Sequence, residues 1–103
     1  MTCAAPIIQR FFDQMPEVGV LTTKSICLEP RLGYREPILS QYAPGCFVNA
    51  VGLTNPGALK SAELLGELKI PDDRFLLISI FGGSVEEYVE VAKILAPFGD
   101  GLE

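Results

Sequence analysis

The residues best suited to chemistry are Lys24 and the hydroxyl side chains beside it in the segment LTTKS, residues 21–25. They follow Val18–Thr22, a short apolar run rich in β-branched residues that predicts a strand. Parallel α/β folds place their active sites at the carboxyl ends of strands. A lysine at that place would stabilise negative charge on a cofactor or substrate. The alternative interpretation is a surface lysine that simply follows a strand.

A second candidate is the turn NAVGLTNP, residues 49–56, which is rich in hydrogen-bonding groups. It leads into a predicted helix, with Asn55 as the N-cap and Pro56 as the first helical residue. Backbone N–H groups exposed by such a turn can bind an anion or a carbonyl oxygen. The alternative interpretation is that the turn only caps the helix.

Composition excludes several kinds of site. The 103-residue chain contains no histidine, which rules out Ser-His-Asp and Cys-His catalysis and metal sites built on histidine. Its three cysteines, Cys3, Cys27 and Cys46, form an odd and widely spaced set. Such a set argues against structural zinc and against a disulfide framework. We therefore expect free thiols that behave as small apolar residues, and no metal site.

Charge and hydropathy narrow the partners and the location. The net charge is −5 and the 8 Lys and Arg residues are scattered, so no basic cluster is available to bind nucleic acid. No apolar run reaches the roughly 18–20 residues that a membrane span requires. The segment Met1–Arg10 lacks a basic region followed by an apolar stretch, which argues against a signal peptide. We expect a cytoplasmic protein whose partner is a small molecule.

Three helices are predicted around these candidates. The first spans Ala5–Met15, where apolar residues recur at helical spacing and a proline occupies the first turn. The second follows the Asn55-Pro56 pair, and the third begins at a capping box formed by Ser84 and Glu87. The residues expected on the buried side of the second helix are Leu59, Ala62, Leu65 and Leu68. Those expected on the buried side of the third are Val85, Tyr88, Val89, Ala92 and Leu95.

The strands predict a parallel sheet. Arg74–Phe81 (RFLLISIF) is almost continuously apolar, which is typical of a strand covered on both faces. Leu28–Gly45 is rich in proline, glycine and charge, which predicts a long loop with room for a short strand at Ile38–Tyr42. Gly101–Glu103 would enter another strand. The βα alternation predicts a parallel α/β fold. If the chain folds by itself, we expect an open parallel sheet of three or four strands.

Together the two candidate motifs resemble class 1 dihydroorotate dehydrogenases, which are FMN-dependent TIM barrels that oxidise dihydroorotate to orotate in pyrimidine biosynthesis. The resemblance rests on TTKS followed by LEPR, a glycine and a Glu-Pro pair, and then on NAVGLTNPG. The later ISIFGGS, followed by an acidic helix, fits the next strand and helix of the family. The similarity covers Thr2–Glu103 and implies a partial (β/α)8 barrel made of consecutive βα units.

The resemblance also implies how much of the enzyme is present. A TIM barrel needs about 250 residues, so residues 1–103 are expected to form a single incomplete domain, the amino-terminal part of the barrel. The family's catalytic base lies in an Asn-x-Ser-Cys-Pro-Asn-like loop, which we expect beyond Glu103. The family's FMN phosphate site is likewise expected outside residues 1–103. We assign no catalytic residue and expect the chain alone to be inactive in the reaction.

On the cofactor side, the resemblance implies that Lys24 lies between flavin and pyrimidine and favours the anionic reduced flavin. Ser25 matches a neighbouring FMN contact. Thr2 and Cys3 match a small Ala-Ser-Gly segment beside the flavin. FMN is therefore the expected cofactor.

On the substrate side, Asn49 matches an asparagine that hydrogen-bonds the orotate ring. Val51, Gly52 and Leu53 match positions whose backbone amides receive the orotate carboxylate. Lys24 is expected to touch the substrate as well.

Two alternatives to this function stay open. One is a non-catalytic α/β module that keeps the barrel segment for packing, which a closed sheet edge would favour. The other is a dihydropyrimidine dehydrogenase-type flavoenzyme, which shares the TTKS-like segment. If the chain folds by itself, we expect exposed apolar surface and self-association through open sheet edges.

Overall fold

A small parallel sheet forms the centre of the fold. The computed structural model describes residues 5–103. The strands, in sheet order, are β1 (Val20–Thr22), β4 (Phe75–Ile78) and β5 (Gly101–Leu102). Both neighbouring pairs are parallel, and the central strand buries Leu76 and Ile78 completely. The predicted open parallel sheet is therefore confirmed, and β1 and β5 form its two edges among the described residues.

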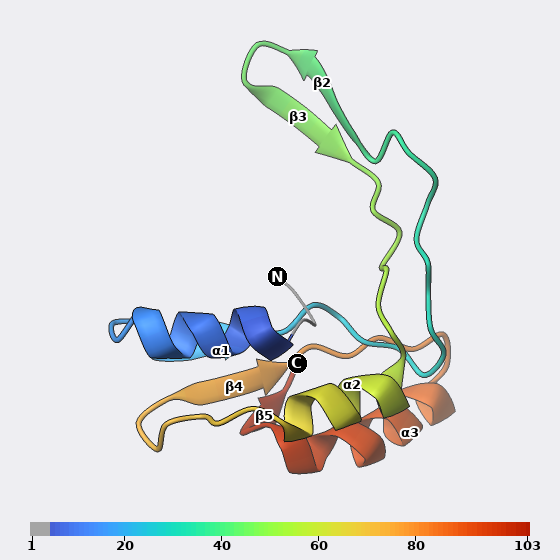
Figure 1. Ribbon diagram of the computed structural model, residues 1–103. Coiled ribbons are helices and arrows are strands. Elements are labelled where there is room, and N and C mark those ends of the chain that lie inside the picture. Colours follow the sequence, from blue (N-terminus) through green and yellow to red (C-terminus); the bar gives the residue numbers. More distant parts are fainter. Residues whose placement is uncertain (1–4) are drawn as a thin grey trace.

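Helices pack against this sheet to make one core. They are α1 (Ala5–Gln14), α2 (Ala58–Gly66) and α3 (Val85–Leu95), followed by a short 3-10 turn, η1 (Ala96–Phe98). Figure 1 shows α2 and α3 side by side. The buried core comprises Ile8, Phe12, Ile26, Ala58, Ala62, Leu65, Leu76, Ile78, Val91 and Leu95. No helix in the described part of the chain is both long and apolar enough to span a membrane.

The second helix starts later than predicted. Gly57, not Asn55, is its N-cap, and α2 begins at Ala58. The physical reason is that the Asn55 side chain is engaged elsewhere, because its Oδ1 accepts the N–H groups of both Cys27 and Gly57. Gly57 has φ +84°, and a Cβ there would lie 3.0 Å from the ring of Pro30. Asn55-Pro56-Gly57 therefore packs against an earlier loop before the helix can start.

The helices carry more apolar surface than the core covers. In α1 the buried residues are Ala5, Ile8 and Phe12, while Ile7 and Phe11, with Met15 just after the helix, form a second stripe that is 40–46% exposed. Leu59, which the pattern places on the buried side of α2, is 75% exposed. Periodicity predicted the helices, but it could not decide which of two apolar faces meets the sheet.

The third helix shows the same ambiguity. Its buried residues are Val91 and Leu95, whereas Val85, Tyr88 and Val89 of the predicted buried side are exposed. Its predicted cap is confirmed, because the Ser84 hydroxyl accepts the N–H of Glu87 at 3.2 Å. The Glu87 carboxylate accepts the N–H of Gly83 at 2.8 Å, one residue before the position of a standard capping box.

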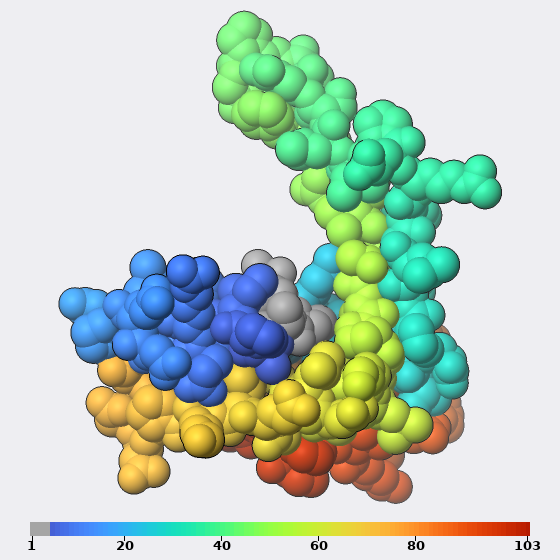
Figure 2. Space-filling model, in the orientation of Figure 1, coloured from blue at the N-terminus to red at the C-terminus, as the bar shows by residue number. Residues whose placement is uncertain are grey.

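A long arm projects from this body (Figures 1 and 2). We define the arm as residues 31–55, because the backbones of Arg31 and Asn55 exchange hydrogen bonds of 2.9 and 3.0 Å at its base. The arm ends in an antiparallel hairpin of β2 (Leu39–Ala43) and β3 (Cys46–Asn49). The projection explains a radius of gyration of 15.0 Å, since a compact 100-residue domain has about 13 Å.

The hairpin refines the predicted loop. A strand was expected at Ile38–Tyr42 and β2 occupies Leu39–Ala43, but β3 was not predicted. A signal for it was present in Pro44-Gly45, which joins the two strands with Gly45 at φ +74°. Proline followed by a glycine with positive φ is the signature of a type II turn.

Candidate functional site

An open hollow of about 470 Å³ lies between the end of β1 and the base of the arm. The residues that line it are Lys24, Arg31, Tyr34, Asn49, Ala50, Val51, Gly52 and Leu53. All the residues expected to contact substrate are among them. The fold has thus brought Lys24 together with a segment that follows it by at least 25 residues.

Lys24 projects from an irregularity at the carboxyl end of β1. Regular pairing continues to Thr23, whose N–H donates to the Leu77 carbonyl at 2.9 Å. The next backbone donor to the neighbouring strand is Ile26, which bonds the Ser79 carbonyl at 2.9 Å. Between these two bonds the chain advances three residues, from Thr23 to Ile26, while the partner segment advances two, from Leu77 to Ser79. One extra residue on one strand defines a β-bulge. Bulges commonly re-aim a side chain beside a functional site, and here the bulge contains Lys24.

Ser25, the second residue of the bulge, does not line the hollow. Its hydroxyl is 2.9 Å from the Ser79 hydroxyl, so it ties the end of β1 to the segment that follows β4. Both side chains are largely shielded, with Ser79 only 8% exposed. The role of Ser25 as an FMN contact stays a prediction, since this geometry shows a bond within the protein.

The substrate-side segment is shaped by very close contact between the two legs of the arm. The Tyr34 N–H donates to the Val51 carbonyl at 3.1 Å, and a Cβ on Gly33 would lie only 2.3 Å from that same oxygen. A Cβ on Gly52 would lie 2.8 Å from the Tyr34 nitrogen. Both glycines have positive φ, and Leu53 shares this conformation at φ +55°, which is rare for a side chain of its size. The legs can approach in this way only because two positions lack a Cβ.

Asn55 fastens this segment to the body. It is 7% exposed, and its Oδ1 accepts the backbone N–H groups of Cys27 at 3.3 Å and Gly57 at 3.0 Å. Its Nδ2 donates to the Leu53 carbonyl at 2.7 Å and to the Cys27 sulfur at 3.2 Å. One side chain therefore joins three separate stretches of backbone, and it does so directly behind the turn that carries Leu53.

The electrostatics of the hollow favour anions. Lys24 and Arg31 contribute two cations, and none of the described residues that line the hollow is a carboxylate, although the chain carries a net charge of −5. The Arg31 guanidinium lies 5.9 Å from the centre of the Phe81 ring, a cation–π distance. Phe81 in turn packs edge-to-face with Tyr88 at 6.5 Å. The body thereby holds Arg31 at the base of the arm.

Sequence reasoning gave no role in the hollow to Arg31 and Tyr34, and it did not foresee that Thr23 and Asn55 support the site from outside its lining. Arg31 was visible only as part of the LEPR string, and Asn55 only as a helix cap. Two expected cofactor contacts, Thr2 and Cys3, lie outside the described residues. Cys27 and Cys46 are free thiols, and no cluster of three or more potential ligands for a metal ion occurs among residues 5–103.

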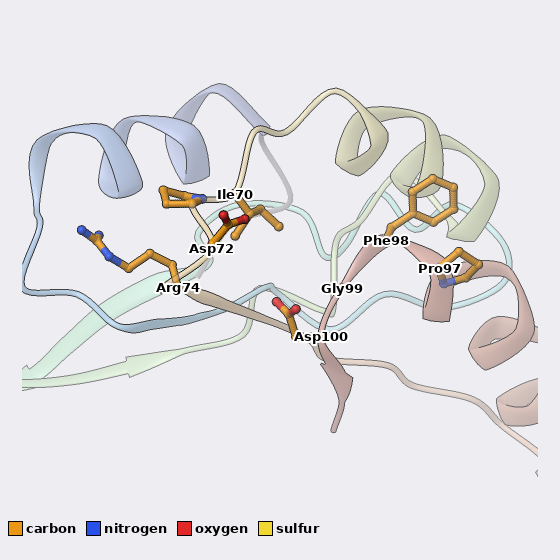
Figure 3. A pocket seen from close by; sticks show the side chains of 8 residues that line it. Ile70, Asp72, Arg74, Pro97, Phe98, Gly99 and Asp100 are labelled. Atoms are coloured by element: carbon orange, nitrogen blue, oxygen red, sulfur yellow. The ribbon is translucent and has the colours of Figure 1, made fainter.

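A second hollow lies at the opposite, amino-terminal edge of the sheet, and two of its charged side chains make hydrogen bonds to the backbone (Figure 3). It contains Arg74, which donates to the carbonyls of Met15 and Val18 at 3.2 Å. It also contains Asp100, whose carboxylate accepts the Leu76 N–H at 2.8 Å. Arg74 and Asp100 thus tie the starts of β4 and β5 to their neighbours.

Comparison with known proteins adds an independent observation. Residues 5–103 match the sequence model of the family described as dihydroorotate dehydrogenase. A relative from Pyrococcus horikoshii, named dihydroorotate dehydrogenase B (NAD(+)), catalytic subunit, is 41% identical over 88 residues, covering 82% of this chain and 27% of the relative. Its namesake from Thermococcus kodakarensis is 39% identical over 100 residues, covering 88% and 32%. That from Methanothermobacter thermautotrophicus is 38% identical over 86 residues, covering 82% and 27%.

Proposed function

The chain belongs to the dihydroorotate dehydrogenase family, and we propose that it forms one wall of a site that binds FMN and oxidises dihydroorotate to orotate. It spans 27–32% of the length of these relatives. We therefore assign it binding and orientation, and assign no catalytic base to its described residues. One observation carries the proposal: Lys24 and residues 49–53 line the same hollow at the carboxyl end of a parallel strand.

The groups around the hollow fit a flavin beside an anionic pyrimidine. Two cations face it and no carboxylate among the described lining residues opposes them. Lys24 and Ser25 would hold FMN, together with Thr2 and Cys3 at the chain start. When bound, FMN supplies the two-electron oxidation chemistry.

Lys24 orients the two ring systems and stabilises negative charge on them. The Lys24 side chain is placed by the bulge, and the residue is half-buried, so less water competes with the charges it meets. A fixed cation acts more strongly there than on a flexible surface loop, because little reorganisation is needed when charge develops.

Residues 49–53 receive the pyrimidine. The backbone N–H groups of Val51, Gly52 and Leu53 have no acceptor among residues 5–103, so they are available to the substrate carboxylate. The Asn49 side chain offers both a donor and an acceptor to the ring amides. The glycine contacts hold this backbone in one conformation, so the chain is ordered before substrate arrives.

Titration of the purified chain with FMN, followed by flavin fluorescence, tests the cofactor half of the proposal. We expect saturable binding that Lys24→Ala weakens by about tenfold, the size of one lost charge-assisted hydrogen bond. Lys60→Ala is the matched control, because Lys60 is exposed and pairs with Glu63 on the same helix, α2. Binding that is absent, or that Lys24→Ala leaves unchanged, would contradict the proposed role.

Orotate tests the substrate half. In the FMN-loaded chain, orotate should perturb the flavin absorption, and Asn49→Ala should weaken this response by about tenfold. Gln41→Ala, on the exposed hairpin, is the control and should leave the response unchanged. Equal orotate affinity in the Asn49→Ala and wild-type chains would remove Asn49 from the site.

A further inference from the structure

Thr23 is fully buried beside Ser79, and its hydroxyl takes the place of a backbone acceptor. In a regular parallel ladder, the Ser79 N–H would donate to the Thr23 carbonyl, and the Ser25 N–H would donate to the Ser79 carbonyl. Instead, the Ser79 N–H donates to Thr23 Oγ1 at 3.1 Å, and Ile26 takes the place of Ser25 as the donor. The side chain thus satisfies the one sheet donor that the bulge would leave without its backbone partner.

The bulge needs the Thr23 hydroxyl as an acceptor because Ser79 is buried. Its N–H lies out of reach of water, and a buried donor without an acceptor is strongly unfavourable. If the Thr23 hydroxyl were absent, the ladder could satisfy Ser79 only by returning to regular register. A one-residue change of register in a strand turns each following side chain to the other face. Lys24 is the next residue, so the face to which its side chain turns depends on the hydroxyl of Thr23.

We propose that Thr23 is a positioning residue for Lys24, holding through its hydroxyl the bulge that carries the ammonium group into the hollow. Thr23 does not line the hollow, so it acts on ligands only through Lys24. The hydroxyl bond between Ser25 and Ser79 closes the bulge from its other side. The effect of Thr23 on ligand binding rests on the proposed function of Lys24. Its effect on the direction of the Lys24 side chain does not.

The geometry can be tested without any cofactor. Thr23→Val removes the hydroxyl at nearly constant volume, while Thr23→Ser keeps it. We expect Thr23→Val to change the acetylation rate of Lys24 by about fivefold relative to Lys60 in the same molecule, measured by mass spectrometry, and to speed amide exchange at Ser79. Thr23→Ser should behave as wild type in both measurements. Unchanged Lys24 acetylation in a folded Thr23→Val chain would overturn the proposal.

FMN titration of a double mutant tests whether Thr23 acts through Lys24. Thr23→Val should weaken FMN binding by about tenfold in the wild-type background and cause no further loss in the Lys24→Ala background. Additive losses would show that Thr23 only supports the fold, and would overturn the proposal. If the wild-type chain binds no FMN, the proposed function fails, while the acetylation experiment still decides the role of Thr23. Should Thr23→Val not fold, Thr23→Ala against Thr23→Ser gives the same comparison.

Discussion

The body and the arm of this molecule are held together by different forces. Leu76, Ile78, Val91 and Leu95 of the body are fully buried, and they meet in one apolar core. In the arm, none of the described residues between Arg31 and Thr54 is buried, and Tyr42 at the hairpin is 73% exposed. The arm is shaped by backbone hydrogen bonds, by two glycines at close contacts and by one asparagine at its base.

The difference explains where the candidate site lies. The body supplies a rigid strand end, from which the bulge projects Lys24. The arm supplies backbone N–H groups that a packed core would have paired with neighbours. A site between them therefore combines the charge of Lys24, which the body positions, with backbone donors and the charge of Arg31 from the arm.

The largest effect that should separate the two regions is loss of core volume. Leu76→Ala should lower the free energy of unfolding by about 2–5 kcal/mol, since it opens a cavity at a completely buried position. Val48→Ala, at a 55% exposed position in the arm, should change it by less than about 0.5 kcal/mol. Urea unfolding followed by circular dichroism measures both. Similar losses in the two variants would mean that the arm shares the body's core.

A smaller effect is expected where the two regions join. Asn55→Ala should lower the free energy of unfolding by about 1–3 kcal/mol, because the buried N–H groups of Cys27 and Gly57 lose their acceptor. Hydrogen exchange should rise at these two amides and throughout residues 31–55. Gln41→Ala, on the exposed hairpin, is the polar control and should leave exchange unchanged. If exchange became faster only at Gly57, Asn55 would support the start of α2 but would not fasten the arm.

The smallest effect on global stability is expected within the arm, at its glycines. Gly33→Ala and Gly45→Ala both place alanine at positive φ, +79° and +74°, a strain of about 1–2 kcal/mol. Only at Gly33 would the new Cβ also clash, at 2.3 Å from the Val51 oxygen, since Gly45 has no atom within 4 Å. We expect Gly33→Ala to abolish protection of the Tyr34 amide and to weaken orotate binding. Gly45→Ala should spare both, and equal behaviour of the two variants would show that the close contact is dispensable.

Several elements were predictable because their signals are local. The first helix was expected at Ala5–Met15 and spans Ala5–Gln14, and the strand expected at Arg74–Phe81 appears as β4 with a further bridge at Ile80. The resemblance pointed to Lys24 and to the segment 49–53, which line the hollow, because LTTKS and NAVGLTNP are contiguous strings. Arg31 and Tyr34 were not identified, since they come to the site only when the two legs of the arm pair.

The sequence by itself determined the family, the βα order and the position of Lys24 at a strand end. Each of these follows from neighbouring residues, so it is present in the chain before folding. Only the tertiary structure decided that Val91 rather than Val85 is buried, that Asn55 fastens the arm rather than capping α2, and that a bulge directs Lys24. These outcomes depend on partners such as Ser79, 56 residues from Thr23, and no local pattern specifies which buried donor a side chain will satisfy.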